Sequence, residues 1–290
     1  MNLLEARWDT LRAALWMGGT LVSFAAMAIA GRELSQEFGT FQVLFWRSAS
    51  GAVIVLVLIA IHGRQYTRTR FFGRHLARNL FHFGAQYGWF YAIALIPLAK
   101  VFAIEFTTPV WLTLMAAMFL GERITKLRWI AVILGFAGVL VITRPGIAAV
   151  HHGDLAVLAA AVGYAAVYAI TKSVADKDEP LTILFYMVLI QTPIASAFSI
   201  SDWNWPTTGL SWVWVFLVGA SALTGHFCMT RAFRLADASV VVPIDFLRLP
   251  LIAVVGYLAY AEAIELWVAA GAALILLGNY LNIREASSRK

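Results

Sequence analysis

The sequence predicts an all-α transmembrane protein whose ten helices form two inverted five-helix repeats. Three observations lead to this prediction: the chain is very apolar, apolar segments of helical length recur along it, and it repeats itself at an offset of 140 residues. Of its 290 residues, 61% are hydrophobic and only 13% are charged. Since a soluble domain carries about a quarter charged residues, the composition indicates a polytopic membrane protein embedded in a lipid bilayer.

Ten apolar segments have about the 20 residues that a helix needs to cross about 30 Å of hydrocarbon. In chain order they cover residues 13–30, 41–61, 77–96, 99–120, 127–143, 153–172, 181–200, 211–231, 238–260 and 264–283. None shows sustained alternation of polar and apolar residues, which excludes membrane strands. The first five segments define an expected repeat at 11–145, and the second five define another at 151–285.

The two repeats match at particular residues. Ile104-Glu105-Phe106 aligns with Ile244-Asp245-Phe246, and Leu44-Phe45-Trp46 aligns with Leu184-Phe185-Tyr186. The matched acids carry the most weight, because acids are rare inside hydrophobic segments. Each repeat holds five crossings, an odd number, so the second repeat enters the bilayer from the opposite side. Such inverted repeats offer a route to alternating access around one central site.

The distribution of Lys and Arg indicates the orientation. With ten spans, both termini lie on one side, and seventeen Lys and Arg lie in the loops and span ends of that side. The other side has three, Arg32, Lys100 and Arg144. The positive-inside rule therefore places both termini in the cytoplasm and the chain in the cytoplasmic (inner) membrane. This topology accounts for the net charge of +6, so no nucleic-acid partner is expected, while a homodimer is left open.

Several motifs carry a family resemblance. Phe45-Trp46-Arg47 stands in the second segment, Tyr91-Ala92-Ile93-Ala94-Leu95 precedes the fourth, and Gly121-Glu122-Arg123-Ile124-Thr125 follows it. The chain resembles the drug/metabolite transporter superfamily, specifically EamA-type ten-helix carriers, over about residues 11–283. The resemblance implies transport of a metabolite through a cavity formed by helices one to four and six to nine.

We therefore expect a secondary active transporter of a small polar or zwitterionic metabolite, working by alternating access and driven by protons or by exchange. Amino acids, vitamins, nucleotide-like cofactors and metal chelators are the substrate types that the resemblance implies. The sequence has no Walker motif and no His-Glu-x-x-His metal motif, so no cofactor, metal or enzymatic activity is expected. Two alternatives are a membrane-embedded enzyme acting on lipid, through His82 or the 151–154 loop, and a non-transporting interaction protein.

Four charged residues lie deep in the apolar segments: Arg47, Glu105, Asp245 and Arg248. Buried charges must be paired, hydrated or neutralised, and in membranes they mark functional sites. Glu105 and Asp245 are the expected proton-coupling and substrate-binding acids, although Asp245 and Arg248 are spaced for a structural ion pair. Arg248 is the expected contact for an anionic substrate group. Arg47 could act likewise or pair with Glu105.

Segment three carries a polar stripe, Asn79, His82, Gln86 and Trp89, whose spacing of three or four residues puts it on one helix face. Such a face turns toward protein or water, so His82, Gln86 and Trp89 are expected in the cavity, with helix–helix hydrogen bonding as the alternative. His226 occupies the repeat position of Gln86 and joins this group. Trp111 and Tyr164 are expected to shape the pocket wall.

Overall fold

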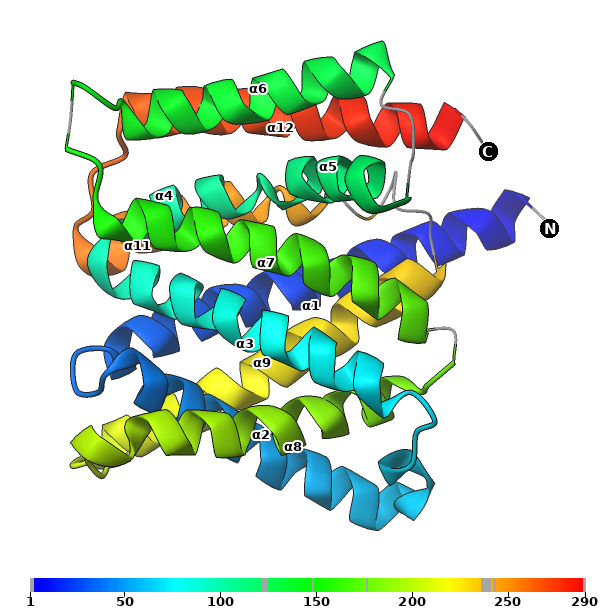
Figure 1. Ribbon diagram of the computed structural model, residues 1–290, viewed down its shortest axis with the longest axis vertical. Coiled ribbons are helices and arrows are strands. Elements are labelled where there is room, and N and C mark those ends of the chain that lie inside the picture. The colour runs from blue at the N-terminus through cyan, green and yellow to red at the C-terminus, as the bar shows by residue number, and fades with distance from the viewer. Residues whose placement is uncertain are drawn as a thin grey trace.

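A computed structural model describes residues 3–120, 125–147, 149–175, 177–235, 241 and 244–288. Over these residues the elements are helices that run side by side, and no strand is present (Figure 1). They are α1 Leu3–Leu34, α2 Thr40–His62, η1 Arg64–Thr67, α3 Phe72–Leu95, α4 Leu98–Glu105, α5 Thr108–Leu120, α6 Lys126–Thr143, α7 His152–Ala175, α8 Pro180–Ser199, η2 Ile200–Asp202, α9 Gly209–Leu235, α11 Arg248–Tyr260 and α12 Leu266–Ser288. Each of the ten predicted segments overlaps a helix. Residues 121–124 of the family-like motif lie outside the described residues.

The helices have the length and composition of membrane spans. Within the described residues, eight stretches are long and apolar enough to cross a bilayer, and α11 is a shorter apolar helix. α3 is 24 residues long but carries a buried polar stripe that includes His75, Asn79 and His82. Because these polar side chains face protein rather than lipid, α3 can cross the bilayer despite its polarity.

The two halves of the chain pack as a pseudo-symmetric pair. The most extensive helix contacts are α1 with α9, α3 with α7, α2 with α8, and α6 with α12, each joining one helix from either half. If each helix is replaced by its equivalent 140 residues away in the chain, the α1–α9 pair becomes the α7–α3 pair. The α2–α8 and α6–α12 pairs then map onto themselves. α1 and α7 run in opposite directions in Figure 1. The predicted fold, all-α with two inverted five-helix repeats, is confirmed.

The fourth crossing is broken where the sequence predicts one continuous segment at 99–120. α4 ends at Glu105 and α5 begins at Thr108, while in the second half Phe246 and Leu247 form a turn before α11 begins at Arg248. The two breaks are 140 residues apart. Buried polar backbone must find partners in a membrane, and the free carbonyl of Phe106 accepts a hydrogen bond from Asn279 Nδ2 at 2.7 Å. Thr108 and Arg248 are therefore repeat equivalents, and each is the first residue of the helix that follows the break.

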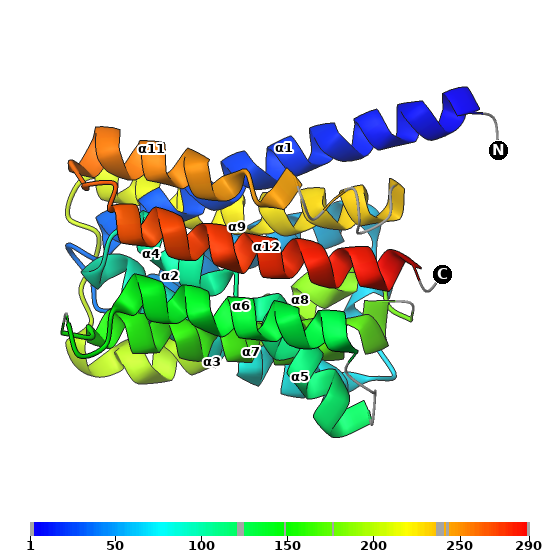
Figure 2. The same ribbon diagram turned by 90° about the horizontal axis from the view of Figure 1, so that it is seen from above.

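Close backbone approach holds α6 against α12. A Cβ atom on Gly138 would lie 2.6 Å from the carbonyl oxygen of Gly271, and one on Gly271 would lie 2.5 Å from the carbonyl oxygen of Gly138. Side chains larger than hydrogen would push the helices apart at this crossing. Both glycines therefore fix the spacing of this pair, which lies along the top edge of the bundle in Figure 1 and faces the viewer in Figure 2.

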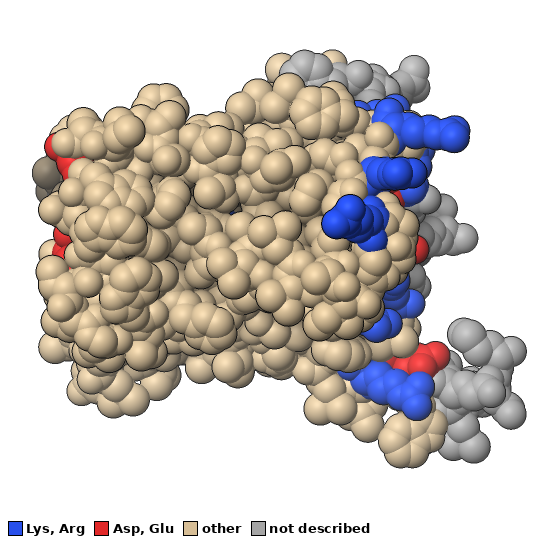
Figure 3. All heavy atoms as spheres, turned by 90° about the horizontal axis from the view of Figure 1, so that it is seen from below, with Lys and Arg blue, Asp and Glu red and all other residues tan. Residues whose placement is uncertain are grey.

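Positive charge is concentrated at one end of the molecule on the face shown in Figure 3. Figure 3 shows Lys and Arg gathered at the end where both termini lie, with a broad uncharged zone between this end and the opposite one. Apolar side chains such as Val53, Leu56, Leu140 and Phe216 are exposed on the candidate spans, as expected for surfaces that face lipid. The distribution agrees with a chain that crosses a membrane along the helix axes.

Candidate functional site

A cavity of about 460 Å³ lies between the two halves and is walled by residues of both. Eight of the ten predicted site residues line it: Arg47, His82, Gln86, Trp89, Glu105, Tyr164, His226 and Arg248. Cavities of roughly 300–1,000 Å³ are typical for small ligands. The structure thus brings together, from six helices, most of the residues that the sequence singled out.

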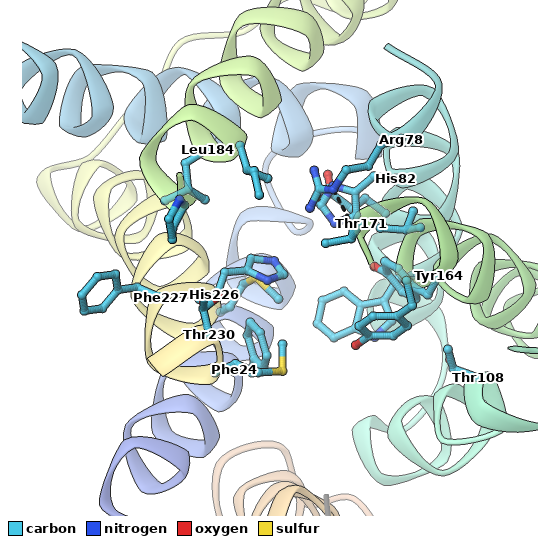
Figure 4. A pocket seen from close by; sticks show the side chains of 18 of the residues that line it. Phe24, Arg78, His82, Thr108, Tyr164, Thr171, Leu184, His226, Phe227 and Thr230 are labelled. Atoms are coloured by element: carbon cyan, nitrogen blue, oxygen red, sulfur yellow. Dashed lines mark hydrogen bonds between the residues drawn. The ribbon is translucent and has the colours of Figure 1, made fainter. Parts of the chain in front are cut away.

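Aromatic and polar side chains face one another across this cavity. Figure 4 shows Phe24 and His226 on one side, and His82 and Tyr164 on the other. The ring of His226 packs edge-on against Phe24 at 5.3 Å between centroids, and it lies 5.9 Å from the ring of His82. The repeat equivalents Phe24 and Tyr164 therefore stand on opposite walls, so a planar ligand between them would meet a ring on either side.

A cluster of three charges lies where the two breaks meet. Arg248 Nη2 lies 3.2 Å from Asp245 Oδ2 and 3.4 Å from Glu105 Oε1. The indole of Trp89 donates to the other oxygen of Glu105 at 2.7 Å. One guanidinium thus joins an acid from each repeat, which satisfies the requirement that buried charges be paired.

Aromatic rings enclose the guanidinium of this cluster. Its central carbon lies 5.2 Å from the ring centroids of Phe24 and Phe102, and 5.1 Å from that of Phe106. Ring faces attract a cation at these distances. Water is largely excluded, and the side chain of Arg248 is 9% exposed. The cluster therefore responds strongly to the gain or loss of one proton or one ligand charge.

A second polar network crosses α2, α3 and α8. Arg47 donates to the side chain of Gln86, which contacts the imidazole of His82 at 3.2 Å. The amide of Gln191 reaches His82 Nδ1 at 2.9 Å and Asn79 Oδ1 at 3.1 Å. The polar stripe of α3 thus serves both expected purposes, since it bonds neighbouring helices and, through His82 and Gln86, faces the cavity.

The cavity extends toward the basic end of the molecule. Asp178 and Pro180, which flank the α7–α8 turn, and Arg234 near the end of α9 belong to its lining. At this mouth Asp178 accepts hydrogen bonds from His75 Nε2 at 2.7 Å and from Thr69 at 2.6 Å. These contacts tie the α7–α8 turn to the start of α3 and define one rim of the opening.

The opposite end is closed by contacts between the halves. Arg32 at the end of α1 pairs with Glu262, and also donates to the carbonyl groups of Ile93 and Ile96, each at 2.6 Å. Glu262 accepts the backbone amide of Leu98, the first residue of α4, at 2.8 Å. It therefore bonds the start of α4 in the other repeat. Arg32, Leu98 and Glu262 are not among the residues that line the cavity.

Two predicted site residues lie apart from the cavity wall. Asp245 reaches the site through Arg248, to which it is paired. Trp111 donates its indole N–H to Thr107 at 3.2 Å and packs against Phe136 of α6 at 5.1 Å. The aromatic character of Trp111 gave no indication of the face it occupies. Residues 151–154 were expected in a loop, but His152, Gly153 and Asp154 form the first turn of α7, where Asp154 binds Lys100 at 2.9 Å.

Sequence reasoning missed Arg78, which lines the cavity and is buried. Arg78 was counted among the loop and span-end charges, because the third segment was expected to begin at residue 77. The helix begins at Phe72, so Arg78 lies inside it. The signal was present, because Arg78 precedes His82 and Gln86 at intervals of four residues and thus shares their helix face.

Comparison with known proteins decides the family. The profile of the EamA-like transporter family matches residues 11–144 and again residues 151–284. The chain belongs to the EamA-like transporter family. A riboflavin transporter of Vibrio cholerae is 30% identical to it, over 94% of this chain and 93% of the other. An S-adenosylmethionine uptake transporter of Rickettsia felis is 25% identical, over 95% of this chain and 94% of the other.

The chain is also similar to a further transporter and to a solved structure. A pseudopaline exporter of Pseudomonas aeruginosa is 28% identical, over 88% of this chain and 90% of the other. A solved crystal structure superposes with a TM-score of 0.66 at 18% identity and covers 96% of this chain, which shows a shared fold. This EamA-like transporter is a multi-pass membrane protein that carries a small metabolite. The expectation of a transporter rather than an enzyme is confirmed.

Proposed function

We propose that this EamA-like transporter is a secondary active carrier of a small polar or zwitterionic metabolite, and that the structure represents its inward-facing state. One observation carries the proposal: a cavity walled by both halves reaches the basic end, while Arg32, Glu262 and Leu98 close the other. With both termini in the cytoplasm, as the positive-inside rule requires, this mouth faces the cytoplasm of a cell whose inner membrane holds the protein.

The alternating-access step follows from the packing of the halves. We propose that the repeats at 11–145 and 151–285 exchange conformations, so that the contacts at Arg32 and Glu262 break while the mouth near Asp178 closes. The breaks before Thr108 and Arg248 supply flexible points in the two central crossings.

The proposed substrate contacts are the eight cavity residues, with Phe24 and Tyr164 on opposite walls for a planar part of the ligand. Glu105 and Asp245 are the proposed coupling acids. A proton on either would weaken its hold on Arg248 and alter the charge of the cavity. Binding of substrate and of a proton at one cluster is a means of coupling them, because each changes the affinity for the other.

Riboflavin and S-adenosylmethionine are the first substrates to test, because relatives of 30% and 25% identity bear those names. The purified protein would be reconstituted in liposomes, and entry of each labelled compound would be measured with and without an inward proton gradient. Accumulation that collapses with the gradient, with the compound recovered unchanged, is the expected result. A chemically altered product would support the enzyme alternative. Transport would be contradicted if neither compound entered the liposomes and no component of a mixture of amino acids and vitamins entered either.

A further inference from the structure

Among the residues that the structure describes, two buried arginines of the cavity wall have no acidic partner. Arg47 is 3% exposed and Arg78 is 6% exposed, and both line the cavity. Arg47 donates to Gln86, and its Nε has no hydrogen-bond partner. Arg78 donates to Thr171 at 2.8 Å and to Asn79 at 3.3 Å. Within the described residues, the bonds of both guanidiniums go to neutral groups alone.

Arg248 is different, because its charge is already matched. It binds Glu105 and Asp245, so the central cluster holds one positive and two negative groups. Over the described part of the chain, the charged residues that line the cavity are Arg47, Arg78, Arg234, Arg248, Glu105 and Asp178. With Asp245, which is paired to Arg248, this makes four guanidiniums and three carboxylates, one positive charge in excess. Arg47 stands on α2 and Arg78 on α3. Arg248 is therefore less free than Arg47 and Arg78 to receive an added anion.

A purely structural role does not require these charges. The bonds to Thr171 and Gln86 tie α3 to α7 and α2 to α3, but a neutral amide or hydroxyl could donate them equally well. Burial of a cation without a counter-charge is strongly unfavourable, so two such cations facing one cavity indicate that a negative group joins them. A guanidinium is also the side chain that matches the planar fork of a carboxylate or phosphate.

The polar network between the two arginines keeps them in place. Gln86, His82, Gln191 and Asn79 bond to one another and connect Arg47 to Arg78 through neutral side chains. Arg78 lies one helical turn nearer the cytoplasmic mouth than His82 on α3. An anion that enters from the mouth would thus meet Arg78 before it reaches Gln86 and Arg47.

We propose that Arg47 and Arg78 form an oxyanion subsite that binds the carboxylate or phosphate of the transported metabolite. The subsite rests on the proposed transport function and adds the charge class of the substrate. The aromatic walls at Phe24 and Tyr164 hold the planar part of the ligand, while the two guanidiniums hold its anionic end. Substrates with an oxyanion are accordingly favoured over neutral or cationic compounds of the same shape.

Charge-matched probes test the subsite on the wild-type protein in detergent. Three probes share the indole ring system and differ in charge: indole-3-acetate is negative, indole-3-acetamide is neutral and tryptamine is positive. Riboflavin 5′-phosphate and riboflavin form a second pair, which separates phosphate from carboxylate. Calorimetry should show each anion binding at least about tenfold more tightly than its neutral partner, the scale of one charge-assisted hydrogen bond. Equal binding within both pairs, tighter binding of tryptamine, or no binding of either anion would overturn the subsite.

Variants then assign the preference to residues. Arg78→Gln and Arg47→Gln should each reduce the anion preference severalfold, while Arg78→Lys should retain part of it. The matched control is Arg74→Gln, one turn earlier on α3, since Arg74 is exposed and donates to the carbonyl of Ser173. Arg74→Gln should keep the full preference. A wild-type preference that survives both Gln substitutions would place the anion elsewhere and refute the assignment.

The two proposals fail in different ways. Liposome flux of the neutral compounds, without any anion preference in binding, would leave the carrier function intact and remove the subsite. Anion binding that depends on Arg47 and Arg78, without flux of any compound, would uphold the subsite and refute transport. Both measurements use the full chain.

Discussion

The guanidinium of Arg248 lies 3.4 Å from the carboxylate of Glu105, so a cation of the second repeat neutralises an acid of the first. Glu105→Gln keeps the acceptor for the indole of Trp89 but cannot ionise. Proton-driven uptake in liposomes should fall by about tenfold or more, the effect of ~1.4 kcal/mol, while counterflow without a gradient persists. The exposed Asp202→Asn variant should behave as wild type. Undiminished gradient-driven uptake would remove Glu105 from coupling.

Removal of the central cation should destabilise the protein. Arg248→Ala leaves Glu105 and Asp245, which are 16% and 20% exposed, without their cation, and loss of one partner of a fully buried ion pair costs about 3–5 kcal/mol as an upper limit. Thermal melting in detergent should shift down accordingly. The triple variant Arg248→Ala/Glu105→Gln/Asp245→Asn should recover much of the loss, because no uncompensated charge is left. A single variant that melts like wild type would show that the pairing contributes little.

Weakening the closed end should favour the outward-facing state. Arg32→Gln and Glu262→Gln each break the pair that joins α1 to the end of α11. In a Cys228→Ser background, a cysteine at the buried Val101 of α4 should react severalfold faster with a membrane-impermeant thiol reagent added from the non-cytoplasmic side. Glu265→Gln, an exposed acid at the same end, is the control. Unchanged labelling in both variants would contradict a gating contact.

Lowering the pH should reduce the stability that Glu37, in the loop between α1 and α2, gives to the fold. Hydrogen bonds from the hydroxyl of Ser211 and from Thr207, opposed by partial burial, lower the pKa of Glu37 below its usual value. The pKa of Glu37 is lower in the folded protein than in the unfolded chain. The ionised carboxylate therefore stabilises the fold fully above the unfolded-state pKa of about 4.3, and this stabilisation is lost as the pH falls through the folded-state pKa.

The test compares wild type with Glu37→Gln by thermal melting between about pH 6 and about pH 3. The variant should be less stable than wild type at the upper end, and the difference should shrink toward the lower end. A difference that is constant with pH would show that ionisation of Glu37 adds nothing.

Packing of α6 on α12 should not tolerate one added methyl group. Gly138→Ala would place Cβ 2.6 Å from the Gly271 carbonyl and 2.5 Å from Ile275 Cγ1, and overpacking costs about 1–3 kcal/mol. Gly84→Ala on α3 is the control, since a Cβ there meets nothing within 4 Å and alanine favours helix by up to ~1 kcal/mol. Equal melting temperatures for the two variants would contradict the close approach.

The sequence was sufficient for the fold because its signals are periodic. Matched acids at Glu105 and Asp245, together with segment lengths, define two repeats without any knowledge of contacts. Pro109 indicates an interruption near Phe106, because proline has no N–H and its ring clashes with the carbonyl four residues earlier, that of Glu105. The partners that satisfy the backbone at this interruption were not predictable from local pattern. The stability of the interruption depends on Thr108 bonding the carbonyl of Glu105, and on Asn279, which is 173 positions away, bonding that of Phe106. An apolar run gives no sign of such a partner.

The site was predictable where residues share a helix face and not where distant chain segments meet. His82, Gln86 and Trp89 follow from spacing alone. The Arg32–Glu262 pair joins residues 230 positions apart, and neither residue has a local spacing that identifies its partner. Arg78 lay within reach of the spacing rule, yet its proximity to a loop made a topological interpretation the simpler one.

The equivalence of Thr108 and Arg248 has an energetic consequence. Exchange of conformations between perfectly identical halves would give two end states of equal free energy. Here the first half has the neutral Thr108 where the second half has the cation Arg248. When the halves exchange conformations, the charge of Arg248 therefore lies in different surroundings in the two end states. The two end states then differ in free energy, and the empty carrier has a preferred resting direction. Over a complete cycle this difference cancels, because the carrier returns to its starting state, so it sets the resting direction and not the work of a turnover.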